Sequence, residues 1–326
     1  MECEPYAPRP APPGGLARIA GAPDTVSTPA SRRCRRPSAT RLRMHDNRYL
    51  QLDVFADRPG GGNPLGVVLD AGAWTAHSMQ AFAAWTGLVE TTFLLPPTRA
   101  DASYRLRIYT PSREIPFAGH PTIGSAHAVL EAGLAQARDG LLVQECAAGL
   151  LPIQVDGEGA ARVLSVRSPA ARIVREGAGS QPLLQPLLAG VRTGRHPPAF
   201  VEGGRRWWLA EFADESALRQ WTPDHAAIAA LARADDALGL CVYARAAGAD
   251  YDLVVRAFPA GVVIVEDPAA GAANGLIGAY LAQREPHGGL ARGYRVSQGR
   301  ELGRDARITV RIEGPEAVWV GGRTHT

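Results

Sequence analysis

Two stretches of small, uncharged residues constrain the fold of this chain more than any other feature. One runs from His120 to Leu130 after Gly119, and the other runs from Ala272 to Leu281 after Gly271. Neither contains Asp, Glu, Lys or Arg, whereas a helix on the surface of a globular protein normally shows a charged face. Both are also too short to span a bilayer. The sequence therefore predicts two helices that are buried on all sides, each inside a curved sheet.

The segments that lead into these two helices are alike. Arg107-Ile108-Tyr109-Thr110-Pro111 precedes the first, and Arg256-Ala257-Phe258-Pro259 precedes the second. Each is a strand pattern followed by a loop of about ten residues and a glycine, which indicates an internal repeat. We predict an α+β fold with two similar lobes, each a curved mixed sheet wrapped around a central helix. The N-terminal lobe is expected at 44–158, joined by a C-terminal strand at about 314–326, and the C-terminal lobe at 159–313.

Segments of alternating or β-branched residues, bounded by turn residues, predict the strands of these sheets. They lie at 49–55, 65–69, 90–95, 104–109, 162–167, 206–211, 238–243, 251–258, 294–298, 307–312 and 317–320, and a helix is predicted at 74–85.

Residues 1–43 have a different character from the rest of the chain. They are rich in Pro, Ala, Ser and Arg without hydrophobic periodicity, so they cannot bury enough apolar surface to offset the entropy of ordering. We interpret them as a disordered extension, or as residues upstream of a true start at Met44; a nucleic-acid arm or an organelle transit peptide is the alternative. They carry a net charge of +5 and the whole chain carries +3, so residues 44–326 carry −2. The globular part therefore does not indicate a nucleic-acid partner.

The composition narrows the classes of function. The chain is 46% hydrophobic and 21% charged, as globular proteins are, and no apolar run approaches the roughly 20 residues of a membrane span. Its four cysteines form no CxxC pair or disulfide pattern, which fits a reducing, cytoplasmic compartment. HExxH, Walker and GxGxxG motifs are absent, so we predict no metal site and no nucleotide cofactor.

Candidate functional residues gather where the two buried helices are predicted to begin. A helix N-terminus offers unpaired N–H groups and partial positive charge, so two such ends facing one cleft would bind a small carboxylate. His120 follows Gly119, and Asp267 lies shortly before Gly271. Glu90 stands in an apolar context at the start of a predicted strand. A buried carboxylate has a raised pKa and can act as a general base near neutral pH.

Each candidate also has an ordinary structural interpretation. Glu90 would then form an exposed ion pair at a strand end, and His120 would cap its helix or bond to a backbone carbonyl. Asp267, before a proline, is a typical turn or N-cap residue. Asn63 in Gly60-Gly61-Gly62-Asn63-Pro64 is a turn former by composition, and His127 is predicted to be a core histidine with a satisfied hydrogen bond.

Six motifs occur in the order seen in the PhzF family of phenazine biosynthesis, so the chain resembles that family from about residue 47 to its C-terminus. The motifs are Asp53-Val54-Phe55, Gly62-Asn63-Pro64, Glu90-Thr91-Thr92-Phe93, Pro116-Phe117-Ala118-Gly119-His120-Pro121-Thr122, Glu266-Asp267-Pro268 with Gly271, and Gln298-Gly299 with Gly303-Arg304. The resemblance implies the diaminopimelate-epimerase-like fold, which agrees with the two uncharged helices.

The resemblance also implies roles for single residues. Glu90 matches the family's catalytic glutamate, which moves a proton between carbons of a small unsaturated amino acid. His120 and Asp267 match the residues that assist at the substrate. The positions that contact the ligand, some through the backbone, are Asn63, Gly119, Gly271 and Ala272. We expect a homodimer without a cofactor, acting on a small carboxylate.

The chain departs from its relatives at several small residues. The related epimerases have a thiol before each helix-opening glycine, and Ala118 and Ala270 stand there, which excludes a two-cysteine racemase. Ala270 also replaces a usual threonine, Ala272 a usual serine, and Val89 a frequent serine beside the predicted base. Each lost hydroxyl removes hydrogen bonds worth about 0.5–1.5 kcal/mol. The backbone N–H donors at these positions remain.

The sequence thus predicts an isomerase that removes and returns a proton through Glu90. Two alternatives stay open. One is a metal-independent lyase or hydrolase on the same scaffold, and the other is a non-catalytic protein that binds a small carboxylate. Retention of His120 and Asp267 beside the glutamate favours an enzyme, whereas Ala272 favours the binding protein.

Overall fold

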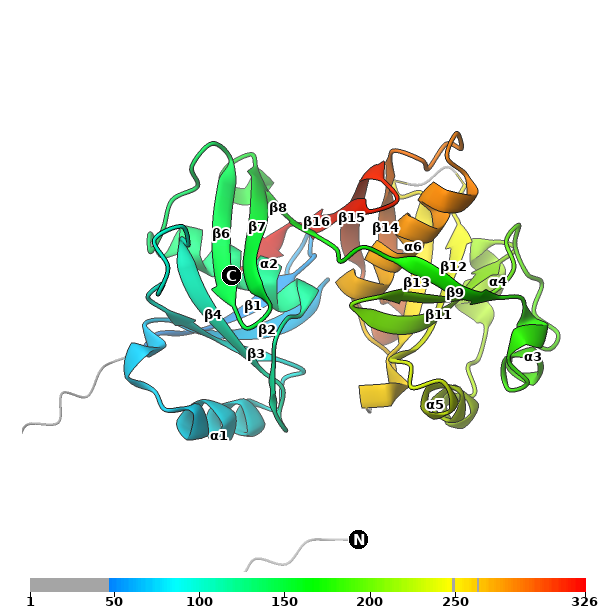
Figure 1. The fold of residues 1–326 in the computed structure, drawn as a ribbon, viewed down its shortest axis with the longest axis horizontal. Helices are drawn as coiled ribbons and strands as arrows, with labels where there is room; N and C mark the ends of the chain where they lie inside the picture. Colours follow the sequence, from blue (N-terminus) through cyan, green and yellow to red (C-terminus); the bar gives the residue numbers. More distant parts are fainter. Residues whose placement is uncertain (1–46, 248–249, 263) are drawn as a thin grey trace, which may run out of the picture. The chain divides into compact units, whose positions relative to one another are not determined.

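The computed structural model describes residues 47–247, 250–262 and 264–326, and the predicted extension at 1–43 lies outside them. Figure 1 shows the ribbon. The elements of the first half are β1 (Tyr49–Val54), β2 (Asn63–Val68), α1 (Ala76–Thr86), β3 (Thr91–Leu95), β4 (Tyr104–Tyr109), β5 (Glu114–Ile115), α2 (Gly119–Glu131), β6 (Leu141–Cys146), β7 (Gly149–Asp156) and β8 (Val163–Arg167). Those of the second half are β9 (Arg172–Glu176), α3 (Leu184–Leu187), β10 (Ala199–Gly203), β11 (Arg205–Phe212), α4 (Glu215–Gln220), α5 (His225–Ala234), β12 (Gly239–Arg245), β13 (Leu253–Phe258), α6 (Gly271–Arg284), β14 (Gly293–Gln298), β15 (Ala306–Gly314), β16 (Ala317–Gly322) and β17 (Thr324–His325).

Strand pairing reveals the internal repeat. In the first half, β1–β2 is antiparallel, β2–β3 parallel, β3–β4 antiparallel, β4–β6 parallel, and β6–β7 and β7–β8 antiparallel. In the second half, β10 to β16 pair in the same succession of antiparallel and parallel ladders. The helices α2 and α6 occupy equivalent places, between β4 and β6 and between β13 and β14. The predicted repeat is therefore present in the topology, although the two copies differ in sequence.

Helix α2 is buried as predicted. It contacts β1, β2, β3, β4, β6, β8, β16 and β17, so strands surround it. All residues from His120 to Val129 are buried. Gly124 allows the close approach, because a Cβ there would lie 2.5 Å from Leu65 Cδ2 and 2.7 Å from Val54 Cγ2. The predicted core histidine is confirmed, since His127 Nε2 lies 3.1 Å from Thr326 Oγ1.

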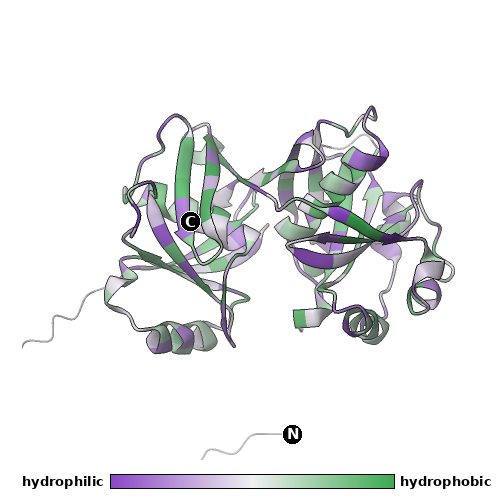
Figure 2. Cartoon of the chain, viewed as in Figure 1, coloured by the Kyte–Doolittle hydropathy of each residue, from purple (hydrophilic) through white to green (hydrophobic). Residues whose placement is uncertain are grey.

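Helix α6 has the equivalent environment in the second half. It contacts β9, β10, β11, β15 and β16, and all but one of the residues from Gly271 to Ala282 are buried. A Cβ on Gly278 would lie 2.9 Å from Val318 Cγ1, so the strand packs directly on the helix backbone. Figure 2 shows hydrophobic and hydrophilic residues mixed along the strands around the helices, as sheets with one face buried require.

The predicted strands are largely confirmed, with differences at their ends. The strand at 104–109 coincides with β4, and the helix predicted at 74–85 is α1, which begins two residues later. Thr75 sets that start, because its Oγ1 accepts a hydrogen bond from Ser78 N at 3.1 Å. The hairpin β6–β7 was missed by the sequence analysis. Proline is normally evidence against a central strand. Pro152 nevertheless lies inside β7, at an exposed position.

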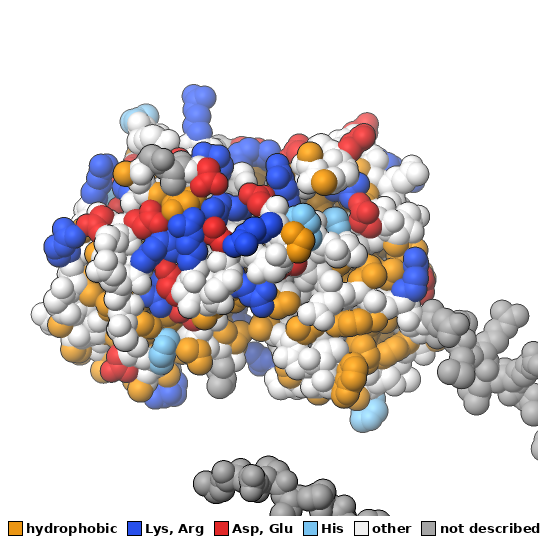
Figure 3. Space-filling model, turned by 180° about the vertical axis from the view of Figure 1, so that it is seen from behind, with side chains coloured by type: hydrophobic (Ala, Val, Ile, Leu, Met, Phe, Trp, Pro, Cys, Tyr) orange, Lys and Arg blue, Asp and Glu red, His pale blue; other side chains and the backbone are white. Residues whose placement is uncertain are grey.

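The surface mixes charges of both signs. Figure 3 shows basic and acidic side chains interspersed on one face. Exposed ion pairs occur on the surface, such as that of Arg99 with Asp101 at 3.0 Å and that of Arg48 with Asp70 at 3.8 Å. Such exposed pairs contribute about 0–1 kcal/mol each, so the buried sheets and helices hold the fold together.

Candidate active site

Glu90 lies one residue before β3 and is nearly excluded from water. The prediction that it begins the strand is therefore wrong by one residue. Its side chain is 12% exposed, and Oε2 is buried without a hydrogen-bond partner among the described residues. Every residue of β3 that follows it is buried. Burial, helped by the negative charge of Asp267, raises the pKa of Glu90 to about 8. The carboxyl group is therefore mainly protonated at neutral pH.

His120 is the second residue of α2 and faces Glu90. Its Nε2 lies 3.5 Å from Glu90 Oε2, and this nitrogen is also buried without a hydrogen-bond partner in the described part of the chain. Burial lowers the pKa of His120 to about 3, so the imidazole is neutral at physiological pH. The two groups are thus a carboxylic acid and a neutral imidazole rather than a salt bridge. Their separation leaves both polar atoms available to a ligand.

Asp267 lies in the loop before α6, and hydrogen bonds fix its carboxylate. Its Oδ1 accepts from Asn63 Nδ2 and from Ala269 N, both at 2.9 Å. Burial raises the pKa of Asp267 to about 6, although these two hydrogen bonds oppose the rise. The bond to Ala269 N is the turn contact that the structural interpretation of this residue predicts. The same carboxylate also acts electrostatically on Glu90, and its role toward a substrate stays a prediction.

Asn63 connects the two halves of the chain at this point. Its Nδ2 donates to Asp267 Oδ1 and, at 3.2 Å, to Ala269 O, while its Oδ1 is buried without a partner in the described residues. A tight turn places it, because Gly62 N donates to Asp53 Oδ1 at 3.0 Å. A Cβ on Gly62 would lie 2.1 Å from Val54 O, so only glycine fits. The amide is therefore held by protein, and its free oxygen can accept a hydrogen bond from a ligand.

The N-termini of α2 and α6 meet at the same place. An ideal Cβ on Gly119 would lie 3.8 Å from Gly271 Cα and 3.9 Å from Ala272 N. The N-caps Ala118 and Ala270 provide no side-chain hydrogen bond to either helix. Unpaired N–H groups of both helices therefore point toward one small region, which favours a negatively charged group there. Ala272 is exposed, so this region opens to solvent beside it.

The structure thus brings together every residue that the sequence analysis selected. It also shows a supporting residue to which that analysis gave no role. Gln298 is fully buried; its Nε2 donates to Asp267 O at 2.8 Å, and its Oε1 accepts from Ala270 N at 3.3 Å and from Asn274 Nδ2 at 3.0 Å. The signal in the sequence was the Gln298-Gly299 motif, whose function only these contacts explain.

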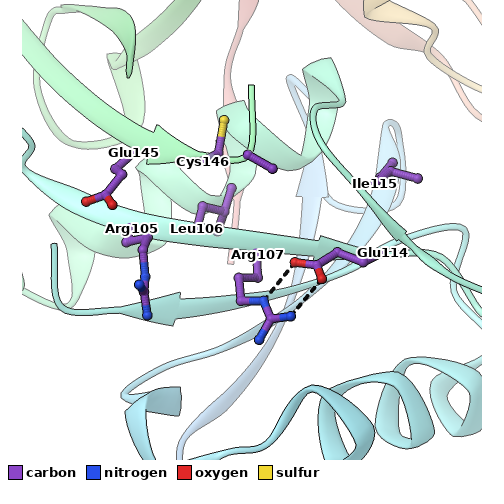
Figure 4. A pocket seen from close by; sticks show the side chains of 8 residues that line it. Arg105, Leu106, Arg107, Glu114, Ile115, Glu145 and Cys146 are labelled. Carbon is purple, nitrogen blue, oxygen red and sulfur yellow. Dashed lines mark hydrogen bonds and ion pairs between the residues drawn. The ribbon is translucent and has the colours of Figure 1, made fainter. Parts of the chain in front are cut away.

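Two surface hollows lie elsewhere. Figure 4 shows the first, lined by Arg105, Leu106, Arg107, Glu114, Ile115, Glu145, Cys146 and Ala147. The second is lined by Asp57, Val163, Asp250, Arg295, Arg307, Ile308, Thr309, Gly322 and Arg323. Neither contains a predicted site residue. Among the described residues, no three His, Cys, Asp or Glu side chains gather as metal ligands would, and none of the helices there is long and apolar enough to cross a membrane.

Solved structures with the same fold define the class of this protein. A PhzF-family phenazine biosynthesis protein of Bacillus anthracis superposes with a TM-score of 0.72 at 27% sequence identity, covering 85% of this chain and 95% of that one. A hydroxyproline epimerase of Agrobacterium vitis shares the fold, with a TM-score of 0.56 at 14% identity over 86% and 90% of the two chains. The predicted α+β, epimerase-like fold class is therefore confirmed.

Sequence comparison narrows the class to a family. The chain is 32% identical over 274 residues to trans-2,3-dihydro-3-hydroxyanthranilate isomerase of Pseudomonas aeruginosa, covering 83% of this chain and 91% of that protein. It is 35% identical over 289 residues to an uncharacterized isomerase of Deinococcus radiodurans, covering 84% and 91%. Residues 52–326 match the family described as phenazine biosynthesis-like protein, PhzC-PhzF. The chain belongs to this family, and it is an isomerase.

Proposed function

We propose that Glu90 moves a proton within a small carboxylate-bearing substrate, by general acid–base catalysis without a cofactor. The observation that carries this proposal is the pair formed by Glu90 Oε2 and His120 Nε2. The two atoms lie 3.5 Å apart, both are buried, and neither has a hydrogen-bond partner in the described chain. Buried polar atoms without partners are rare and require an explanation, which a substrate that contacts both groups provides.

The raised pKa of Glu90 suits it to move a proton in both directions. With a pKa of about 8, roughly one tenth of the carboxyl groups are ionised at pH 7, so the base and the acid are both populated. The ionised form takes a proton from a substrate carbon, and the C–H electron pair becomes part of a new double bond. The old double bond accepts the returned proton at another carbon. The substrate keeps its atoms, and no oxidant or reductant is needed.

The surrounding groups would hold the substrate for this transfer. Backbone N–H groups at Gly119, Gly271 and Ala272 would bind its carboxylate, and the convergence of two helix N-termini there supports this. Neutral His120 and the carboxylate of Asp267 would bind polar groups close to the reacting carbons. The free Oδ1 of Asn63 would accept a hydrogen bond from an amino or hydroxyl group.

The Pseudomonas aeruginosa relative is named trans-2,3-dihydro-3-hydroxyanthranilate isomerase, so trans-2,3-dihydro-3-hydroxyanthranilate is the first compound to test. Ala270 and Ala272 provide no hydroxyl groups, so the substrate is held by backbone donors at this helix end. We therefore propose a small unsaturated amino acid of this chemical class and test a panel built around that compound.

The experiment incubates the protein with the panel in D2O and follows products by NMR and mass spectrometry. An isomer of unchanged composition, with or without deuterium at the new C–H position, supports the proposal, and Glu90→Gln serves as the inactive control. Loss of a leaving group or addition of water would instead identify a lyase or a hydrolase. Saturable binding by the wild-type protein, with neither exchange nor product across the panel, would contradict the proposed proton transfer.

A further inference from the structure

Two arginine–glutamate pairs occupy equivalent positions before α2 and α6. Arg107 on β4 bonds Glu114 through Nε and Nη2, both at 2.7 Å, as Figure 4 shows. Arg256 on β13 bonds Glu266 in the same bidentate way, at 2.9 and 3.0 Å. Each glutamate stands five residues before the glycine that opens its helix. The repeat therefore includes a clamp on each loop that leads into a buried helix.

Each arginine also covers an aromatic ring two residues further along its strand. The guanidinium of Arg107 lies 5.3 Å from the ring centre of Tyr109, and that of Arg256 lies 5.2 Å from the ring centre of Phe258. Stacking of this kind holds the planar guanidinium in one orientation, which favours bidentate pairing with a carboxylate. Because the two clamps match in pairing, spacing and stacking, the effects of substitutions in each can be compared within one chain.

The clamps differ in burial. The side chains of Arg107 and Glu114 are 28% and 37% exposed, whereas those of Arg256 and Glu266 are 5% and 6% exposed. Arg256 also donates from Nη1 to Trp221 O at 2.7 Å. A charge pair removed from water interacts more strongly and tolerates less change in geometry than a solvated pair. The second clamp is therefore the rigid one.

Only the buried clamp adjoins a candidate catalytic carboxylate. Glu266 is directly followed by Asp267, and Arg256 is directly followed by Ala257. Asp267 N donates to Ala257 O at 2.8 Å, and these two residues form an isolated antiparallel bridge. The ion pair and this backbone bond thus lie side by side and tie the loop to β13. Glu114, by contrast, lies six residues before His120.

We propose that the Arg256–Glu266 pair is the positioning device of the site: it fixes the loop so that the Asp267 carboxylate faces Asn63 and the proton-transferring Glu90. This inference rests on the proposed function, because it assigns Asp267 a place in that reaction. Arg256 and Glu266 are positioning residues, since their own side-chain contacts are to each other, to a ring and to backbone oxygen. The equivalent pair in the first half stabilises its loop without touching the reaction.

The test compares Glu266→Gln with the matched control Glu114→Gln. Glu266→Gln keeps the shape and removes half of the bidentate pair, so the loop gains freedom. Since misplacement of a reacting group by about 1 Å costs about 10²-fold in rate, we expect kcat to fall about tenfold to hundredfold with a small change in KM. Glu114→Gln should keep kcat within about twofold of the wild-type value.

A second readout does not depend on turnover. The carboxyl carbons of ¹³C-labelled aspartates are titrated by NMR, with Asp267→Asn used for assignment. The negative charge of Glu266 contributes to the raised pKa of Asp267, so Glu266→Gln should move the Asp267 midpoint to lower pH. Glu114→Gln should leave it unchanged. Loss of the Glu266 charge produces this shift even in an unmoved loop, so the position of the loop is tested in a variant that keeps the net charge of the pair. If wild-type protein converts no compound of the panel, the proposed function fails while the titration of that variant still tests the clamp.

A double variant separates a loss of stability from a loss of positioning. Glu266→Gln leaves the Arg256 charge buried without its full partner and can destabilise the protein, whereas Arg256→Met with Glu266→Gln removes both charges. The double variant leaves the net charge of the pair unchanged, so it should melt closer to wild type than Glu266→Gln does, yet show the same loss of kcat and a displaced Asp267 midpoint. Normal kcat and an unmoved Asp267 midpoint in a folded double variant would overturn the inference and make the pair purely structural.

Discussion

Replacing Glu90 with glutamine should make the protein more stable and less active, and the gain in stability should depend on pH. The pKa of Glu90 rises from 4.5 to about 8 because the folded protein excludes water from the carboxyl group. A raised pKa means that the stability contributed by the protonated group is fully present below pH 4.5 and is lost as the pH rises toward 8. Glutamine does not titrate, so the stability of the variant does not fall with pH in this way.

The size of the stability difference follows from the shift in the pKa of Glu90. Each unit of pKa difference corresponds to about 1.4 kcal/mol, so wild type should lose on the order of 3 kcal/mol relative to Glu90→Gln by pH 7. This figure is an upper estimate, because structure retained in the unfolded chain reduces it. At roughly 2–4 °C per kcal/mol, the variant should melt several degrees higher than wild type at pH 7–8. The two should nearly coincide at pH 4.5.

The assay is thermal unfolding of both proteins from pH 4.5 to 8.5, beside turnover on the substrate found in the panel. Glu316→Gln, the same substitution at an exposed glutamate, is the control. Turnover of Glu90→Gln should fall by the 10²–10⁴-fold that is typical of a lost general base. A melting difference that is flat across this range, or near-normal turnover, would refute the assignment of Glu90 as a buried proton carrier.

Four further predictions follow from the site and the fold. The pH profile of kcat/KM should rise with pH through about 8, the pKa at which half of the Glu90 carboxyl groups are ionised, and a fall across that range would contradict the base. His120→Ala and Asp267→Asn should reduce turnover less than Glu90→Gln does, and complete loss only in His120→Ala would make the histidine the base. Gly62→Ala should destabilise the fold because its Cβ would lie 2.1 Å from Val54 O, whereas Gly289→Ala, with open space around it, should be tolerated; equal melting temperatures would refute this. Incubation with EDTA should leave activity unchanged, and loss restored by zinc or iron would reveal a metal.

Much of the fold could be predicted because its strongest signals are local. Charged side chains cannot be buried on all sides without great cost, so ten or more consecutive residues without Asp, Glu, Lys or Arg indicate a buried helix. Both such stretches are the central helices α2 and α6. The β6–β7 hairpin was missed because Pro152 weakens the strand signal, and only pairing with β8 and β4 gives these strands their place.

The site could be predicted as a set of residues but not as an arrangement. Motif order selected Glu90, His120 and Asp267, since a family resemblance preserves residue types in sequence. It could not reveal that the amide donors of Asn63 are used by a loop 204 residues away, or that Gln298 holds that loop from a third segment. These contacts depend on strand register across both halves of the chain, which local sequence does not encode.

The sequence by itself therefore determined the class of fold, the family and the residue types of the site, because burial patterns and motifs are written along the chain. Tertiary structure alone decided the protonation state of the site. Glu90 is a weak acid with a pKa of about 8, and His120 is neutral, only because distant segments exclude water from both and place the charge of Asp267 near the glutamate. The physical reason is that the free energy of a charge depends on everything packed around it in space, and most of those neighbours are far away in the sequence.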